Sequence, residues 1–163
     1  MKPPTCSTCG APNDELGRAL PPKDPDGFRH PVLTVDAIAV RTGAQGPEVL
    51  LIQRGQPPHE GMMAFPGGFV DYGEDPKMAV LRELEEECGI TGGDPRVLAV
   101  LGAPHRDPRK HVVTVAYRVD VGPEEPMAGD DAAEARFVPL DEARQWPSDR
   151  WAFDHRSLLE HIL

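Results

Sequence analysis

The chain has 163 residues, and its 17 basic and 27 acidic side chains give a formal net charge of −10. A chain of this length is expected to form one domain with a single hydrophobic core, and its negative charge argues against functions that require binding to nucleic acid or to an anionic membrane surface. Three cysteines do not make a disulfide framework, and we expect neither a membrane-spanning run nor a signal peptide, so the expected location is the reducing cytoplasm.

Residues 1–31 are predicted to form a flexible, proline-rich arm. They hold seven of the 19 prolines and show little hydrophobic periodicity. Within them, Cys6 and Cys9 form a CxxC pair that resembles half of a zinc ribbon, but a structural zinc requires four ligands and the sequence has no second such pair. A mobile arm without zinc is therefore the favoured interpretation, and a zinc completed by His30 or by a second subunit is the alternative.

Residues 32–163 are predicted to form one α/β domain. Runs of β-branched and apolar residues, separated by turn-forming residues, indicate strands. In chain order the predicted strands are 34–41, 48–54, two short segments of 62–70 around Pro66-Gly67-Gly68, 96–102, 111–119 and 134–140. The apolar residues Leu158, Leu159 and Ile162 favour a closing helix within 153–163.

A helix between the fourth and fifth of these strands has the best-defined ends. Asp75 can accept hydrogen bonds at the N-cap, Pro76 suits the first helical position, and Gly89 suits the left-handed residue after the last turn. At about 100° per residue, one arc of this helix about 100° wide is apolar and is predicted to be buried. Its residues are Val80, Leu81, Leu84 and Cys88.

The same helix carries carboxylates away from that arc, at Glu83, Glu86 and Glu87. Like charges at helix-neighbour spacing repel each other, so this cluster is either a freely solvated face or a site for a cation. Magnesium ions are held by a few carboxylates together with substrate phosphates, and glutamates at positions i, i+3 and i+4 of a rigid helix supply such ligands.

Residues next to the cluster are suited to support a cation site. Arg82 can orient a carboxylate through a bidentate pair, and Glu74, near the start of the helix, can hold Arg82 in turn. The Gly67-Gly68 turn lets backbone carbonyl groups approach closely, because no side chain intervenes.

The spacing of these residues resembles the signature box of the Nudix hydrolases. Gly68 is followed after five residues by Glu74, and after seven more by RELEEECGI, which ends at Ile90. The resemblance implies an α/β fold over 32–163, in which a mixed β-sheet is sandwiched between α-helices. It also implies hydrolysis of a nucleoside diphosphate linked to another moiety, with Mg²⁺ or Mn²⁺ as the required cofactor.

The resemblance also implies roles for single residues. Glu83 and Glu87 are the expected direct metal ligands, and Glu86 is expected to be a ligand or a water-orienting partner. The carbonyl group of Gly67 is a candidate fourth contact. Glu86 and Arg82 are accordingly candidate catalytic residues.

The segment APHRDPRKHVVTVAY (103–117) resembles the segment that follows the box in the ADP-ribose pyrophosphatase branch of the family. Its cations Arg106, Arg109 and Lys110 are expected to face substrate phosphates, and a charged hairpin loop is the alternative. His105 departs from the residue type expected in this segment, so no contact is assigned to it.

Further candidate substrate-binding residues are Arg54, Gly68 and Asp131. Arg54 ends a strand and resembles the family's substrate-side arginine, with a surface salt bridge as the alternative. Enzymes of this branch carry a carboxylate on a loop before the last strand, proposed as the general base. Asp130, Asp131 and Glu134 are the candidates, Glu134 is narrowly favoured, and capping or solvation of the loop is the alternative for all three.

Adenine recognition normally needs an aromatic or apolar platform, and the chain has few aromatic residues. Aromatic side chains this sparse more often belong to the core than to a ligand-stacking site. The available residues are Phe28, Phe65, Tyr72, Trp151 and Phe153.

The function predicted from this resemblance is metal-dependent hydrolysis of ADP-ribose to AMP and ribose 5-phosphate. The expected partners are a small nucleotide-sugar diphosphate and a second copy of the chain in a homodimer. One alternative is a Nudix enzyme for another nucleotide, such as an oxidised deoxynucleoside triphosphate, dihydroneopterin triphosphate or NADH. Another is a non-catalytic sensor of ADP-ribose that regulates transcription.

Overall fold

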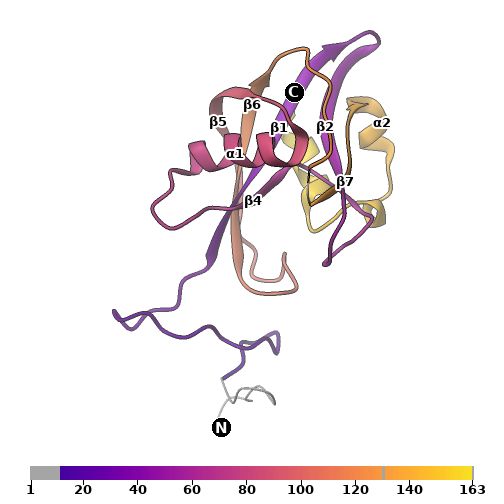
Figure 1. Cartoon of the computed structure of the whole chain (residues 1–163). Coiled ribbons are helices and arrows are strands. Elements are labelled where there is room, and N and C mark those ends of the chain that lie inside the picture. Colours follow the sequence, from indigo (N-terminus) through magenta and orange to yellow (C-terminus); the bar gives the residue numbers. More distant parts are fainter. Residues whose placement is uncertain (1–11, 130, 163) are drawn as a thin grey trace.

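The computed structural model describes residues 12–129 and 131–162. The expectations for Cys6, Cys9 and Asp130 lie outside the described residues. The described part of the arm consists of turns and one isolated β-bridge, between Asn13 and Ala19, and it extends away from the domain (Figure 1). A hydrogen bond joins it to the loop before the sixth strand, where the guanidinium of Arg18 donates to the carbonyl of Asp107 at 2.9 Å.

The domain is built on a seven-stranded mixed sheet, as expected. Strands β3, β2, β1, β6 and β5 follow one another across it, β4 pairs with β1, and β7 pairs with β2. The pair β1–β6 is parallel and the other pairs are antiparallel. The bounds are β1 Val32–Gly43, β2 Gly46–Arg54, β3 Met63–Ala64, β4 Gly67–Phe69, β5 Gly92–Leu101, β6 Val112–Val121 and β7 Ala132–Pro139.

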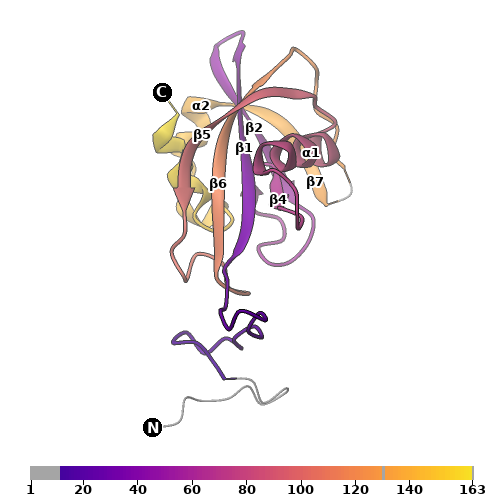
Figure 2. The same ribbon diagram turned by 90° about the vertical axis from the view of Figure 1, so that its left-hand side faces the viewer.

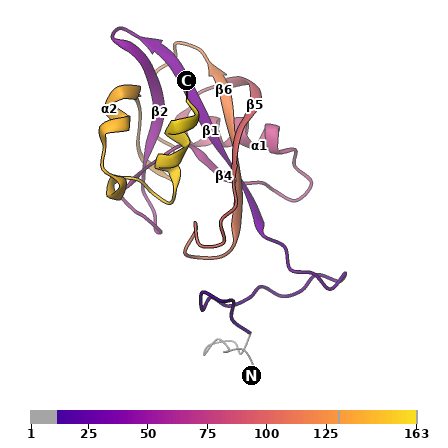
Figure 3. The same ribbon diagram turned by 180° about the vertical axis from the view of Figure 1, so that it is seen from behind.

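Helices cover both faces of this sheet, which confirms the expected sandwich (Figures 1 and 3). Because side chains alternate along a strand, β1 contributes to two cores: Val35 packs on one side of the sheet and Ile38 on the opposite side. Helix α1 (Pro76–Cys88) covers one face, and α2 (Leu140–Gln145) and the 3₁₀ helix η2 (His155–His161) cover the other. Figure 2 shows the sheet between these two layers. None of the helices in the described ranges is long and apolar enough to cross a membrane.

Helix α1 begins and ends as the sequence predicts. The side chain of Asp75 accepts a hydrogen bond from the amide of Lys77 at 2.8 Å, Pro76 opens the helix, and Gly89 follows it with a φ of 64°. The predicted apolar arc faces the core, with Leu81 only partly buried. Two residues outside that arc, Ala79 and Glu87, are also buried on this helix.

The C-terminal region differs from the prediction in three places. The expected closing helix is a 3₁₀ helix that begins at His155, since Phe153 has a φ of 53° and cannot belong to a right-handed helix. Helix α2 and the 3₁₀ turn η1 (Ser148–Arg150) were not predicted. Both are too short to show a helical period in the sequence.

Candidate active site

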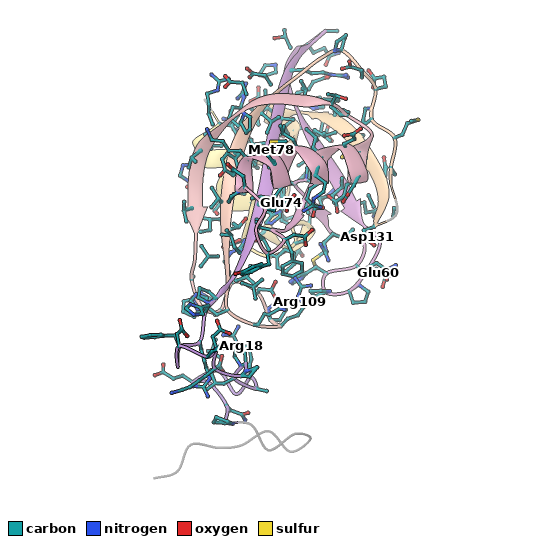
Figure 4. The ribbon with its side chains drawn as sticks, turned by 60° about the vertical axis from the view of Figure 1, so that its left-hand side comes forward. Arg18, Glu60, Glu74, Met78, Arg109 and Asp131 are labelled. Carbon is teal, nitrogen blue, oxygen red and sulfur yellow. The ribbon has the colours of Figure 1, made fainter. Side chains whose placement is uncertain are left out.

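A cavity of about 340 Å³ lies between helix α1, strands β1 and β4, and the loops that follow β2 and precede β6 and β7. Figure 4 shows Glu74, Asp131 and Arg109 around this region, below α1. The residues that line the cavity come from parts of the chain that are far apart in sequence. The charged and polar lining residues are Thr34, Asp36, Arg54, Gln56, Asp71, Arg82, Glu83, Glu87, Arg106, Asp107, Arg109, Asp131 and His155.

Glu83 and Glu87 form the acidic wall on helix α1. Glu87 is 9% exposed, and its Oε2 accepts a hydrogen bond from the amide of Gly67 at 2.9 Å. Burial raises the pKa of Glu87 to about 8, the Gly67 amide opposes this, and the charge of Glu83 adds to it. Burial also raises the pKa of Glu83, against the hydrogen bond from Arg82. Both carboxylates therefore lack part of the positive charge that would stabilise their ionised forms.

Arg82 uses all of its hydrogen-bond donors to hold this wall together. A guanidinium offers five N–H groups in a fixed geometry, and those of Arg82 donate to Glu74 at 2.8 and 2.9 Å, Glu83 at 2.8 Å, Glu86 at 3.1 Å and the carbonyl of Phe69 at 3.1 Å. The hydrogen bonds from Arg82 lower the pKa of Glu74 to about 2. The expected Glu74–Arg82 pair is thus present, and the separate hydrogen bond from Arg82 to the carbonyl of Phe69 fixes α1 to the end of strand β4.

Gly67 and Gly68 lie in strand β4 rather than in the expected turn, and they leave space beside these carboxylates. A Cβ atom on Gly68 would overlap the carboxylate of Glu83, and a Cβ atom on Gly67 would overlap the backbone of β1 at Val35 and Asp36. The acidic wall therefore adjoins bare backbone. Two buried or half-buried carboxylates on a rigid helix, beside backbone without side chains, supply oxygen ligands of the kind that Mg²⁺ takes.

The opposite wall is basic. The Nε of Arg54 donates to the carbonyl of Pro58 at 2.8 Å, and burial, followed by the nearby charge of Arg109, lowers its pKa. Arg109 is held by Asp107, whose oxygens accept its Nε at 3.1 Å and its Nη2 at 2.8 Å. The two guanidinium groups repel each other, and an anion bound between them relieves this repulsion.

Arg106 lines the cavity, but its guanidinium is bound elsewhere. Its side chain is 4% exposed and donates three hydrogen bonds of 2.7–3.2 Å to Asp154. This ion pair links the loop before β6 to the turn before η2. The geometry therefore favours a role in positioning the basic wall over direct binding of phosphate.

The ring of Phe153 lies beside both arginines of this wall. The ring centroid of Phe153 lies 5.1 Å from the Cζ of Arg54 and 5.9 Å from the Cζ of Arg109. His59 contacts Phe153 edge-on at 4.6 Å, and both residues have a positive φ, of 63° and 53°. Bulky residues with a positive φ are uncommon and gather at functional sites.

The structure leaves other predicted residues outside the cavity. Glu86 is 59% exposed at the rim, where it is bound to Arg82. Glu134 lies in β7 with its side chain 52% exposed and paired with Arg136. Lys110 lies beside the ring of Phe69, at 5.2 Å from its centroid. Of the predicted base candidates that are described, only Asp131 lines the cavity.

Some of the predicted aromatic residues line the cavity and others do not. Among the described residues, Phe65 and Phe153 line the cavity, whereas Phe28 and Tyr72 are exposed and Trp151 is buried in the core. Sequence reasoning missed six polar lining residues, which are Thr34, Asp36, Gln56, Asp71, Asp107 and His155. An aspartate within an apolar strand was the available signal for Asp36, because a buried carboxylate requires a partner.

The chain is similar in sequence to known proteins. A sequence model of the family described as "NUDIX domain" matches residues 31–162. The ADP-ribose pyrophosphatase of Methanocaldococcus jannaschii is 38% identical over 136 residues, which cover 83% of this chain and 75% of that protein. The ADPR responsive transcriptional repressor NtrR of Acinetobacter baylyi is 34% identical over 137 residues, which cover 82% of this chain but only 53% of the repressor.

The chain is also similar in fold to a solved structure. The NUDIX domain of Shewanella oneidensis NrtR, complexed with ADP ribose, is 33% identical in sequence and superposes with a TM-score of 0.76. The match covers 85% of this chain and 90% of that domain.

Proposed function

We propose that this chain, which belongs to the Nudix family, hydrolyses the diphosphate of ADP-ribose to AMP and ribose 5-phosphate in the presence of Mg²⁺ or Mn²⁺. The observation that carries the proposal is the division of one cavity into an acidic wall, Glu83 and Glu87, and a basic wall, Arg54 and Arg109. A diphosphate between two organic groups needs both walls. The identity of 38% with an ADP-ribose pyrophosphatase supports the choice of substrate.

The acidic wall would hold the cation. Glu83 and Glu87 are the proposed ligands, and Glu86, at the rim, is a further ligand or orients water. When bound, the divalent ion supplies neutralisation of the diphosphate charge and activation of water. Arg82 keeps Glu83 and Glu86 in place through its hydrogen bonds, and the Gly67 amide does the same for Glu87.

The basic wall would bind and orient the substrate. Arg54 and Arg109 are the proposed phosphate contacts, and the ring of Phe153 lies beside both guanidinium groups. In the reaction, the oxygen of water bonds to one phosphorus, the bond from that phosphorus to the bridging oxygen breaks, and each product keeps one phosphate group. Asp131 is the proposed acceptor of the proton from water, because it lines the cavity whereas Glu134 does not.

A second candidate function is recognition of ADP-ribose without hydrolysis. It is favoured by the likeness to a NUDIX domain that was solved with ADP ribose and belongs to NrtR. The intact set of carboxylates on α1 supports the enzyme over the sensor.

Product analysis with ADP-ribose decides between these functions. We expect AMP and ribose 5-phosphate in equal amounts with Mg²⁺ or Mn²⁺ present, neither product with EDTA, and at least about a hundredfold slower formation of both with Glu87→Gln. Saturable binding of ADP-ribose without products would favour the sensor. A panel with NADH, dihydroneopterin triphosphate and an oxidised deoxynucleoside triphosphate would identify another preferred substrate. The homodimer implied by the family resemblance stays a prediction, which sedimentation velocity tests.

A further inference from the structure

The segment Phe65–Gly67 joins helix α1 to the layer on the other face of the sheet. Its three residues have only two backbone N–H groups, because Pro66 has none. The amide of Phe65 donates to Nδ1 of His155 at 3.1 Å, and the amide of Gly67 donates to Oε2 of Glu87 at 2.9 Å. Every donor of this segment is thus used to connect His155 with a proposed metal ligand.

The ring of His155 is held in one orientation. Its side chain is 6% exposed, and Nε2 faces Oδ1 of Asp36 at 3.5 Å. Because Nδ1 accepts a hydrogen bond, the proton of the neutral ring lies on Nε2, toward this carboxylate. Asp36 is itself fixed by the hydroxyl of Thr114, which donates to its other oxygen at 2.5 Å. The position of Nδ1, which accepts from the Phe65 amide, is therefore fixed by buried contacts that run from Thr114 in β6 through Asp36 to His155 in η2.

The neighbouring residue serves the other wall of the cavity. Asp154 binds Arg106, whereas His155 reaches Phe65. Ala152 secures the same turn, since its amide donates to the carbonyl of Met63 at 2.9 Å. Two consecutive side chains thus connect to opposite walls, which allows their effects to be separated by experiment.

We propose that His155 is a positioning residue for the metal site, which acts on Glu87 through the backbone of Phe65–Gly67. The inference rests on the proposed function, because it requires Glu87 to hold the cation. Removing the acceptor at Nδ1 leaves the Phe65 amide without its hydrogen bond. The segment Phe65–Gly67, whose Gly67 amide orients the Glu87 carboxylate, then becomes less rigid. Partners of metal ligands typically contribute about 10- to 100-fold to metal affinity.

The test compares His155→Gln with His155→Asn. The Oδ1 of asparagine takes the place of Nδ1 and keeps the acceptor, whereas the glutamine amide extends toward the place of Nε2 and leaves the Phe65 amide without one. Mn²⁺ affinity is measured directly, by electron paramagnetic resonance of free Mn²⁺ or by calorimetry, without substrate. We expect the dissociation constant to rise by about tenfold or more in His155→Gln, and His155→Asn to restore affinity close to that of the wild type.

Asp154→Asn is the matched control for general loosening of this turn. It weakens the hold on Arg106, so we expect a higher KM for ADP-ribose with an unchanged Mn²⁺ dissociation constant. An equal loss of Mn²⁺ affinity in this control, or in both His155 variants, would overturn the inference, as would unchanged affinity in His155→Gln. Absence of Mn²⁺ binding in the wild type would overturn the proposed function together with it.

A measurement on the wild type covers the case in which His155→Gln does not fold. The protein is titrated with Mg²⁺, and the nitrogen signal of His155 Nδ1 and the amide signals of Phe65 and Gly67 are followed by NMR. Shifts of all three with one common dissociation constant support the coupling. A His155 signal that stays constant while the Gly67 amide shifts contradicts it.

Discussion

Arg82 and Glu74 form a bidentate ion pair at the edge of the cavity, with Nε–Oε1 and Nη2–Oε2 distances of 2.8 and 2.9 Å. The pair joins the middle of α1 to the segment that precedes it. The remaining donors of the same guanidinium bind Glu83, Glu86 and the carbonyl of Phe69. One side chain therefore determines the relative positions of two proposed metal-site carboxylates and strand β4.

Replacement of Arg82 by lysine tests this arrangement. An ammonium group cannot bind all these acceptors in one plane, so we expect kcat/KM for ADP-ribose to fall at least about tenfold, in line with the role of such partners in metal sites. Arg96→Lys is the control, because Arg96 forms an exposed ion pair away from the cavity, in which its Nη2 donates to both carboxylate oxygens of Asp120. Equal activity of the two variants in steady-state assays would show that the guanidinium geometry is dispensable.

Glu86→Gln and Glu87→Gln are each expected to lower turnover at least about a hundredfold, as loss of the charge that a catalytic cation requires should do. The fold should survive, because glutamine has nearly the same volume and its carbonyl oxygen can still accept the Gly67 amide in place of Glu87. Steady-state kinetics at saturating Mg²⁺, with circular dichroism of each variant, provide the measurement. Normal turnover in both would end the metal-site assignment.

Asp131→Asn and Glu134→Gln separate the two candidate bases. Asp131 lines the cavity, whereas Glu134 is paired with Arg136 on the surface. Loss of a general base costs about 10²–10⁴-fold in rate, so we expect a fall of that size in kcat for Asp131→Asn and less than about a threefold change for Glu134→Gln. The opposite order would restore Glu134, the residue that the sequence favours.

Arg109→Gln is expected to raise the KM for ADP-ribose at least about tenfold, because a charge-assisted contact to phosphate contributes about 1.5–3 kcal/mol. Lys110→Gln is the matched control. It removes the adjacent cation, which lies beside Phe69 and does not line the cavity. The two variants are compared in initial-rate assays, and a similar KM for both would mean that only the overall charge of the loop matters.

The buried imidazole of His155 predicts a pH-dependent stability. Burial lowers its pKa from the ordinary value of 6.5, although Asp36 opposes this. Below pH 6.5 the unfolded chain therefore binds a proton that the folded chain does not, and the contribution of His155 to stability is lost as the pH falls toward its folded pKa. Urea unfolding at pH 7.5, 6.5 and 5.5 should show this decline in the wild type and a smaller one in His155→Asn. Parallel declines would contradict the prediction.

The sequence by itself determined the features that depend on near neighbours. The ends of α1 follow from the chemistry of Asp75, Pro76 and Gly89. The contact between Glu74 and Arg82 spans eight residues of one local motif. The strands follow from runs of β-branched and apolar residues, and the family resemblance supplied the mixed sheet that joins them.

Only the tertiary structure decided which charged groups share the cavity. Arg106 and Asp154 are 48 residues apart in the sequence, and Phe65 and His155 are 90 residues apart. Local residue spacing therefore predicts neither contact. The same packing turns Glu134 outward and brings Asp131 inward. Side-chain direction at such positions depends on where distant elements meet, and that is settled by the burial of both cores and by the need of each buried polar group for a partner.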